Sequence, residues 1–196
     1  MPMKNEKTQR TLPTSQQLEA EVGRERYRHR YGSVFRSTIY TLITVAAVAI
    51  LVATLWLPVL RIYNNSMTPT LVEGNIVVSV KTDTFEPGDV IAFYYNNKIL
   101  VKRVIAGPGD WVNITEDGTV YVNDVPLDEP YLEEKAFGDC DIELPYQVPE
   151  SRVFVMGDHR SVSVDSRSTA IGCVAEENIV GKLVFRVWPL ADFGGI

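Results

Sequence analysis

The sequence predicts a mainly β protein, in which an antiparallel β-sheet domain follows one transmembrane helix. Residues 1–36 are polar and basic, residues 37–60 carry no charged side chain, and residues 61–196 contain short runs of Val, Ile, Tyr and Phe separated by turn residues. A chain of 196 residues has room for one domain and an appendage. We therefore expect a tail at 1–36, a membrane-spanning helix at 37–60 and a single β domain at 61–196.

Charge is distributed unevenly along the chain. Residues 1–36 hold eight Lys and Arg against four Asp and Glu, whereas residues 37–196 hold eleven against twenty-one. The larger part would repel phosphate, which argues against a nucleic-acid partner. Because the whole chain has two Cys and two His, a four-ligand zinc site would need all of them, including His29 in the tail. We therefore expect no metal site.

The apolar segment 37–60 is long enough to cross a bilayer, since about twenty apolar residues span the hydrocarbon core. Arg36 and Arg61 flank it, and Tyr40 and Trp56 lie near its ends, where amphipathic rings favour the headgroup region. A cleavable secretory signal would have a shorter apolar region, of about 7–15 residues, followed by a small-residue cleavage site. A buried helix of a soluble protein is the other alternative.

The excess of basic residues before the apolar segment predicts its orientation in the membrane. Lys and Arg are retained on the cytoplasmic side, which places 1–36 in the cytoplasm and 61–196 outside it. The sequence thus predicts a single-pass protein of the cell membrane with an extracytoplasmic β domain.

Seven segments of the β domain are predicted as strands, because each is rich in β-branched and aromatic residues. They are residues 75–80, 89–95, 99–106, 111–114, 119–122, 152–156 and 179–188. Asn96-Asn97 is predicted as a two-residue hairpin turn and Asp117-Gly118 as a second turn. Residues 128–143 hold seven acidic residues and one lysine, which predicts an exposed loop or insertion.

Two side chains outside the membrane compete as a catalytic base. A nucleophilic serine usually relies on a neighbouring base, most often His, and His159 is one candidate. Lys102 is the better one, because strand alternation places it on one face with Leu100, Val104 and Ala106. An ammonium on an apolar face loses hydration, which lowers its pKa toward the range of a proton acceptor. The alternative is a lysine that extends to the sheet edge or pairs with a cross-strand acid.

Ser66 is the candidate nucleophile. It lies in a segment where Pro69 fixes its own φ and restricts Thr68, so that a rigid turn can hold the serine hydroxyl in place. The backbone N–H of Ser66 and the side chain of Asn64 are candidate donors to an oxyanion. Because Ser66 follows the apolar segment by six residues, it stays within roughly 20 Å of the bilayer, where it would act on membrane-held substrates.

A third polar stretch, residues 157–167, follows a predicted strand directly. Asp165 and Arg167 are two positions apart and are expected to form an ion pair that stiffens the turn. Ser163 is able to hydrogen-bond a lysine amine and orient it. The alternative is an ordinary polar loop without a functional role.

Together these stretches resemble one family, the bacterial type I signal peptidases, which are membrane-anchored Ser-Lys endopeptidases. The resemblance covers nearly all of residues 37–190. It comprises the anchor, the Ser-Met-x-Pro-Thr-Leu motif at 66–71, the Lys-Arg pair at 102–103 and the Gly-Asp-x-Arg-x-x-Ser-x-Asp-Ser-Arg motif at 157–167. It implies the β-rich fold of antiparallel sheets that these enzymes share with the LexA-like self-cleaving repressors.

The resemblance also implies the role of each site residue. Ser66 is the nucleophile and Lys102 the general base, Ser163 orients the lysine, and Asp165 and Arg167 support the site. The implied reaction removes N-terminal signal peptides from exported preproteins by acyl transfer and needs no cofactor. The implied partners are membrane-held precursors and the lipid bilayer, and we expect a monomer.

Two other functions fit parts of the sequence. A non-catalytic, membrane-anchored chaperone for surface-fibre (pilus) assembly would resemble this family but would lack the serine or the lysine. A soluble autoproteolytic repressor would carry a DNA-binding domain and no membrane span.

Some positions depart from the family pattern. His159 stands where many members have Asn, and Asn64 stands where much of the family has Ser or Gly, which leaves the second oxyanion donor open. Cys140 and Cys173 both lie outside the membrane, where a disulfide is permitted, and both a bridge and two free thiols stay possible.

Overall fold

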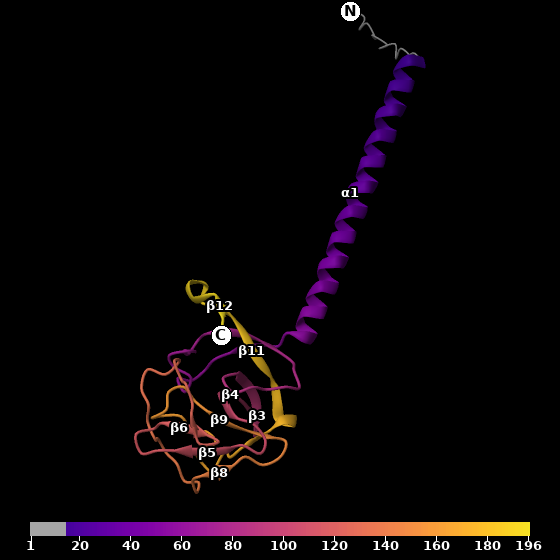
Figure 1. Ribbon diagram of the computed structural model, residues 1–196. Helices are drawn as coiled ribbons and strands as arrows, with labels where there is room; N and C mark the ends of the chain where they lie inside the picture. Colours follow the sequence, from indigo (N-terminus) through magenta and orange to yellow (C-terminus); the bar gives the residue numbers. More distant parts are fainter. Residues whose placement is uncertain (1–14) are drawn as a thin grey trace, which may run out of the picture. The chain divides into compact units, whose positions relative to one another are not determined.

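The computed structural model describes residues 15–196 (Figure 1), so that residues 1–14 and the side chain of His29 lie outside the described part of the chain. The backbone divides into an N-terminal unit that ends at Val52 and a second unit, Ala53–Ile196. The first is helical, and the second is built from short antiparallel strands.

Helix α1, Ser15–Trp56, forms the described part of the N-terminal unit, and its last residues, from Ala53 on, belong to the second unit. Within it, Val34–Val52 is long and apolar enough to cross a membrane, with a mean hydropathy of 1.8. Three threonine hydroxyls of this region donate to the carbonyl four residues earlier, at 2.8–2.9 Å. Because these bonds lie within the helix, the hydroxyls need no water as a partner.

The helix bounds differ from the predicted span of 37–60. The helix ends at Trp56, and the last residues of the predicted span belong to strand β1, Val59–Arg61. Pro58 explains the end of the helix, because it has no N–H to donate and disfavours helical geometry at the preceding Leu57.

The second unit contains two antiparallel sheets. The larger one has the strand order β1-β2-β11-β3-β4-β9-β10, with β12 paired to β11. Its further strands are β2 Ile76–Val80, β3 Val90–Tyr95, β4 Lys98–Ala106, β9 Arg152–Met156, β10 Val174–Ala175, β11 Ile179–Trp188 and β12 Gly194–Gly195. The smaller sheet has the order β7-β6-β5-β8, from Val125–Pro126, Val120–Val122, Trp111–Ile114 and Tyr146–Gln147. Short 3₁₀ helices occur at Glu176–Asn178 and Leu190–Asp192.

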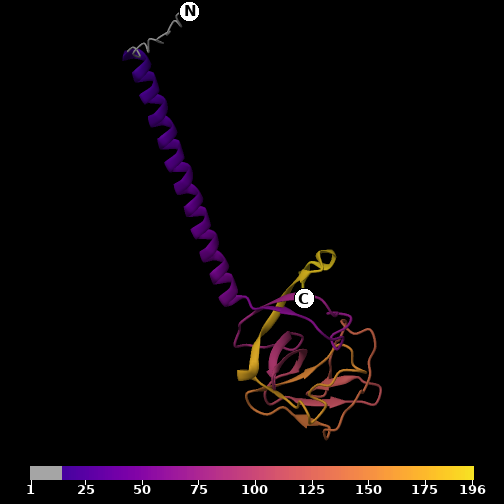
Figure 2. The ribbon, with the colours of Figure 1, turned by 180° about the vertical axis from the view of Figure 1, so that it is seen from behind.

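The predicted fold class is confirmed, and all seven predicted strands occur within one residue of their predicted ends. Asn96-Asn97 joins β3 to β4, and Asn96 has a φ of 51°, as a hairpin turn of this length requires. The short strands β1, β7, β8, β10 and β12 were not predicted, because a run of two or three residues shows no periodicity. Figures 1 and 2 show β11, in yellow, beside the segment that carries β1 and β2.

Residues 128–143 were predicted to be an exposed loop, and this prediction was wrong in part. Glu129 is buried, and its side chain is paired with Arg160. An acidic residue can be buried when an arginine neutralises it, which composition alone does not reveal.

Candidate active site

Strand β4 carries Lys102 into the interior of the larger sheet. Only 3% of Lys102 is exposed, and it lies directly opposite Ile91 of β3. Leu100 and Val104 pack in the same apolar cluster as Ile91, so they share the predicted face with the lysine. Ala106 does not, because a register shift between Val104 and Ala106 moves it into a different cluster.

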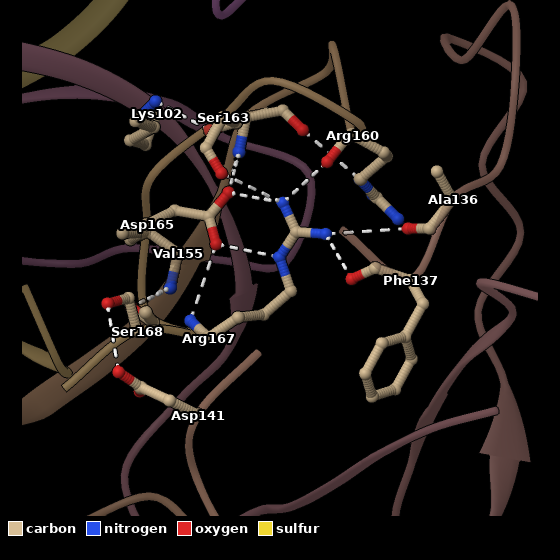
Figure 3. A network of polar contacts seen from close by, with 12 residues as sticks. Lys102, Ala136, Phe137, Asp141, Val155, Arg160, Ser163, Asp165, Arg167 and Ser168 are labelled. Carbon is tan, nitrogen blue, oxygen red and sulfur yellow. Dashed lines mark hydrogen bonds and ion pairs between the residues drawn. The ribbon is translucent and has the colours of Figure 1, made fainter. Parts of the chain in front are cut away.

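The Lys102 amine donates a hydrogen bond of 2.7 Å to Ser163 Oγ. Desolvation lowers the pKa of Lys102 from 10.5 to about 8, with Arg167 acting in the same direction and Asp165 and Asp158 opposing. The residues predicted to share the strand face of Lys102 are all apolar, so the strand pattern did not reveal these two acids. These acids belong to the 157–167 loop, which packs against β4 from elsewhere in the sequence (Figure 3).

Asp165 and Arg167 form a buried ion pair in this loop. The guanidinium donates to both Asp165 oxygens, at 2.8 and 2.9 Å, and to backbone carbonyls of Arg160 and Phe137, at 2.9 and 2.7 Å (Figure 3). Burial alone would raise the pKa of Asp165, but the bonds from Arg167 outweigh it and hold that pKa below its usual value. The pair therefore stays charged and ties the loop together.

Ser66 lies in the loop between β1 and β2, where it is partly exposed. Its neighbours Met67 and Leu71 are fully buried, and both pack in one apolar cluster that fixes this loop. The Ser66 hydroxyl donates to Asn64 Oδ1 at 3.0 Å, and the Ser66 N–H donates to the same oxygen at 3.4 Å. Asn64 thus meets Ser66 through its carbonyl oxygen.

Gly157 is the point where the Ser66 loop meets the 157–167 loop. A Cβ at Gly157 would lie 2.2 Å from Ser163 Oγ and 2.5 Å from the Ser66 carbonyl oxygen. The two loops are also joined by a hydrogen bond of 3.1 Å, which the His159 N–H donates to the Ser66 carbonyl oxygen. Ser163, the partner of Lys102, and Ser66 are therefore both packed against Gly157.

Sequence reasoning did not assign a role to the neighbouring ion pair of Arg103 and Asp158. The guanidinium donates to the two carboxylate oxygens at 2.9 and 2.6 Å and to the Gly88 carbonyl at 2.7 Å. Arg103 follows Lys102 on β4, and Asp158 follows Gly157. Because Arg103 and Asp158 each lie next to a site residue in the sequence, their positions could have indicated this ion pair.

His159 is placed beside Ser66 by its backbone. Its Nδ1 is buried and has no hydrogen-bond partner within residues 15–196. The side chain lines a cavity of about 330 Å³ together with Thr68 and the acidic residues Glu133 and Glu134. Within residues 15–196, no carboxylate therefore orients the imidazole through Nδ1, although a histidine base usually has such a partner.

The two cysteines are free thiols, of which Cys173 is buried and Cys140 is partly exposed. Burial raises the pKa of the Cys173 thiol to about 11, so it is protonated at neutral pH. Across residues 15–196, no group of three or more His, Cys, Asp or Glu is arranged to hold a metal ion.

Comparison with known proteins gives consistent matches. The family described as signal peptidase, peptidase S26, matches residues 35–188. Signal peptidase IB of Staphylococcus aureus is 41% identical over 152 residues, which cover 67% of this chain and 78% of that protein. The chloroplastic thylakoidal processing peptidase 1 of Arabidopsis thaliana is 36% identical over 143 residues, or 64% of this chain and 40% of that protein.

Among solved structures, a signal peptidase I from Enterococcus faecalis is 31% identical. That match has a TM-score of 0.44 and covers 51% of this chain and 97% of the other. The range matched by the family, residues 35–188, contains Ser66, Lys102 and the whole 157–167 loop.

Proposed function

This chain belongs to the signal peptidase family, peptidase S26, and we propose that it removes N-terminal signal peptides from exported preproteins by Ser-Lys acyl transfer. Ser66 is the nucleophile and Lys102 the general base. The observation that carries this proposal is the buried Lys102 amine, whose pKa is lowered to about 8 and which is held by Ser163 at 2.7 Å.

The lowered pKa makes Lys102 suitable as a base at neutral pH. With a pKa of about 8, about one molecule in ten holds the amine neutral at pH 7, against fewer than about one in a thousand for an ordinary lysine. Ser163 orients the amine, while Asp165 and Arg167 hold Ser163 and its loop in place. His159 lacks a partner of this kind for its Nδ1 within the described residues.

The reaction begins with the Ser66 hydroxyl turning from Asn64 toward Lys102. The neutral amine accepts the hydroxyl proton as Ser66 Oγ attacks the scissile carbonyl, and the resulting ammonium protonates the leaving amine. A water molecule, deprotonated by the same lysine, then hydrolyses the acyl-enzyme. Each proton that Lys102 accepts is thus returned within one cycle.

The oxyanion of the tetrahedral intermediate is stabilised by the Ser66 N–H. Asn64 Oδ1, which accepts from this N–H at 3.4 Å, marks the place that a substrate oxygen can take. Asn64 would contribute through its Nδ2 once its side chain has moved out of this place. This makes Asn64 the second donor of the proposed oxyanion hole.

We further propose that the chain is a single-pass membrane protein with residues 1–36 in the cytoplasm and the catalytic domain, from residue 61 on, outside it. The apolar helix segment Val34–Val52 and the basic residues that precede it support this orientation. The substrates are precursors held in the same bilayer by their signal peptides. They would bind as extended strands to a monomer of this chain. The presence of both Ser66 and Lys102 disfavours the non-catalytic chaperone.

The proposal is tested by incubating the full chain in detergent micelles with a panel of precursors and sequencing the new N-termini. Ser66→Ala and Lys102→Met should each lower the cleavage rate by at least about 10³-fold. Cleavage by the unmodified chain should increase as the pH rises through about 8, because the neutral amine is the active form.

His159→Ala is the control for the alternative base and should lower the rate by less than about 10-fold. Equal losses in His159→Ala and Lys102→Met would favour a histidine base. Cleavage retained by Ser66→Ala would exclude Ser66 as the nucleophile.

A further inference from the structure

Three arginines of the site reach one segment outside the family motifs, residues 128–137, which we call the strap. Arg160 pairs with Glu129, the Arg103 guanidinium lies 3.9 Å from the centre of the Tyr131 ring, and Arg167 donates to the Phe137 carbonyl at 2.7 Å. The strap is therefore bound to β4 and to the 157–167 loop at the same time.

The ion pair of Glu129 and Arg160 is fully buried, with side-chain exposures of 0% and 1%. Arg160 also donates from Nε to the Gly157 carbonyl at 3.1 Å. A buried ion pair adds little stability compared with apolar residues of similar size, because desolvation offsets the attraction. Its directional bonds nevertheless fix where the groups lie, and here they fix Gly157.

Tyr131 joins this pair to β4. Its hydroxyl donates to Glu129 Oε1 at 2.9 Å, while its ring lies against Arg103, the residue after Lys102. Burial, with Glu129 adding to it, raises the pKa of Tyr131 above its usual value, so the hydroxyl stays a donor throughout the neutral range. Arg103 in turn binds Asp158.

The turn formed by residues 157–160 is therefore held by Arg160, which is paired with Glu129, and by Arg103 of β4, which is paired with Asp158. The same turn contacts Ser66. Gly157 packs against the Ser66 carbonyl oxygen, and the His159 N–H donates to that oxygen. Lys102 lies on β4, the strand to which Tyr131 connects the turn.

We propose that Tyr131 and Glu129 are positioning residues, which set the placement of Ser66 relative to Lys102 by clamping the 157–160 turn to β4. This inference rests on the proposed Ser66–Lys102 mechanism and adds two residues to it. Neither Tyr131 nor Glu129 touches the reacting atoms, so each acts through Arg103 or Arg160.

The test compares Tyr131→Phe, Glu129→Gln and the double variant in the full chain in detergent. Tyr131→Phe keeps the ring on Arg103 and removes only the hydroxyl. Tyr95→Phe is the matched control, because Tyr95 also donates its hydroxyl in one hydrogen bond, to the Ala170 carbonyl at 2.6 Å, and neither residue belongs to the strap or to the 157–160 turn. The readouts are kcat, KM, the pH dependence of kcat and thermal unfolding.

We expect Tyr131→Phe and Glu129→Gln each to lower kcat by about 10-fold with KM changed by less than about 2-fold, because misplacement of the reacting groups slows chemistry without weakening binding. The midpoint of the pH profile should stay near 8, since the surroundings of Lys102 are kept. The double variant should lose little more than either single one, because both substitutions break the same contact.

An unchanged kcat in Tyr131→Phe, an effect on KM alone, or an equal loss of kcat in Tyr95→Phe would overturn the inference. If Glu129→Gln does not fold, Tyr131→Phe still decides. Ser66→Ala is assayed in parallel: if it cleaves, the proposed mechanism fails, whereas an inactive Ser66→Ala beside a fully active Tyr131→Phe refutes the positioning role alone.

Discussion

At the scale of single residues, the chemistry of Lys102 depends on its burial. An ammonium with 3% exposure has lost most of its hydration, and one hydrogen bond to Ser163 does not replace it. Asp165 lies close enough to stabilise the charged form, but its own charge is bound by Arg167. The balance lowers the pKa of Lys102 to about 8 and so raises the fraction of neutral amine at neutral pH.

The same burial has a consequence for stability. The pKa of Lys102 is about 8 in the folded chain and 10.5 for a free lysine, so the unfolded chain binds the proton more tightly. Burial of the charged lysine therefore lowers the free energy of unfolding. This destabilisation is present in full below pH 8, decreases as the pH rises toward about 10.5, and is absent above it. At about 1.4 kcal/mol per pKa unit, it amounts to about 3 kcal/mol at pH 7.

Lys102→Met should therefore increase the free energy of unfolding at pH 7. We expect a gain of about 2 kcal/mol, because losing the bond to Ser163 offsets about 1 kcal/mol. The gain should shrink at pH 10. Urea unfolding of the full chain in micelles at both pH values measures it, and a variant less stable than the unmodified chain at pH 7 would contradict the prediction.

At the scale of elements, the site is assembled where two loops meet beside one strand. The Ser66 loop is anchored by Met67 and Leu71 in the core, and the 157–167 loop is held by its arginines. Gly157 lets the two loops approach more closely than any side chain would allow. Strand β4 supplies Lys102 from its own position in the sheet.

Gly157→Ala should separate these loops. The added Cβ would overlap Ser163 Oγ and the Ser66 carbonyl oxygen, so we expect a loss of about 1–3 kcal/mol in stability and about 100-fold in kcat. Gly194→Ala is the matched control, because a Cβ there has nothing within 4 Å. Precursor cleavage and thermal unfolding measure both effects, and similar behaviour of the two variants would show that the contact is unimportant.

Much of this arrangement could be predicted from sequence, where a local pattern existed. The longer strands, the Asn96 hairpin and the apolar face of Lys102 all follow from spacing within a few residues. The role of Glu129 could not be predicted, since its partner Arg160 is 31 residues away and the segment around it, residues 128–143, is rich in acidic residues. The contact of Gly157 with Ser66 depends on tertiary packing, which no local spacing encodes.

At the scale of the whole molecule, the apolar side chains of the two units are removed from water in different ways. The β unit buries three apolar clusters between its strands. The side chains of Val34–Val52 are exposed, which for an apolar helix of 19 residues is favourable in lipid and unfavourable in water. The proposed activity on membrane-held precursors requires this helix to remain in the bilayer.

Replacing Val45 and Val48 by Arg should release the chain from membranes. Each arginine at the centre of a span costs about 3 kcal/mol of insertion free energy. Val125→Arg introduces the same charge at an exposed valine of β7 and serves as the control. Flotation with lipid vesicles measures the bound fraction, and retention of the double variant on vesicles would contradict the assignment of the span.

The buried amine also affects which mutations of this chain would be favoured by folding stability. Under the proposed mechanism, a mutation that exchanges this one lysine for an apolar residue yields a more stable molecule that no longer cleaves its substrate. Folding stability alone would therefore favour the inactive form. Under the proposed mechanism, a chain that carries the amine therefore keeps its activity at a continuing cost in folding stability.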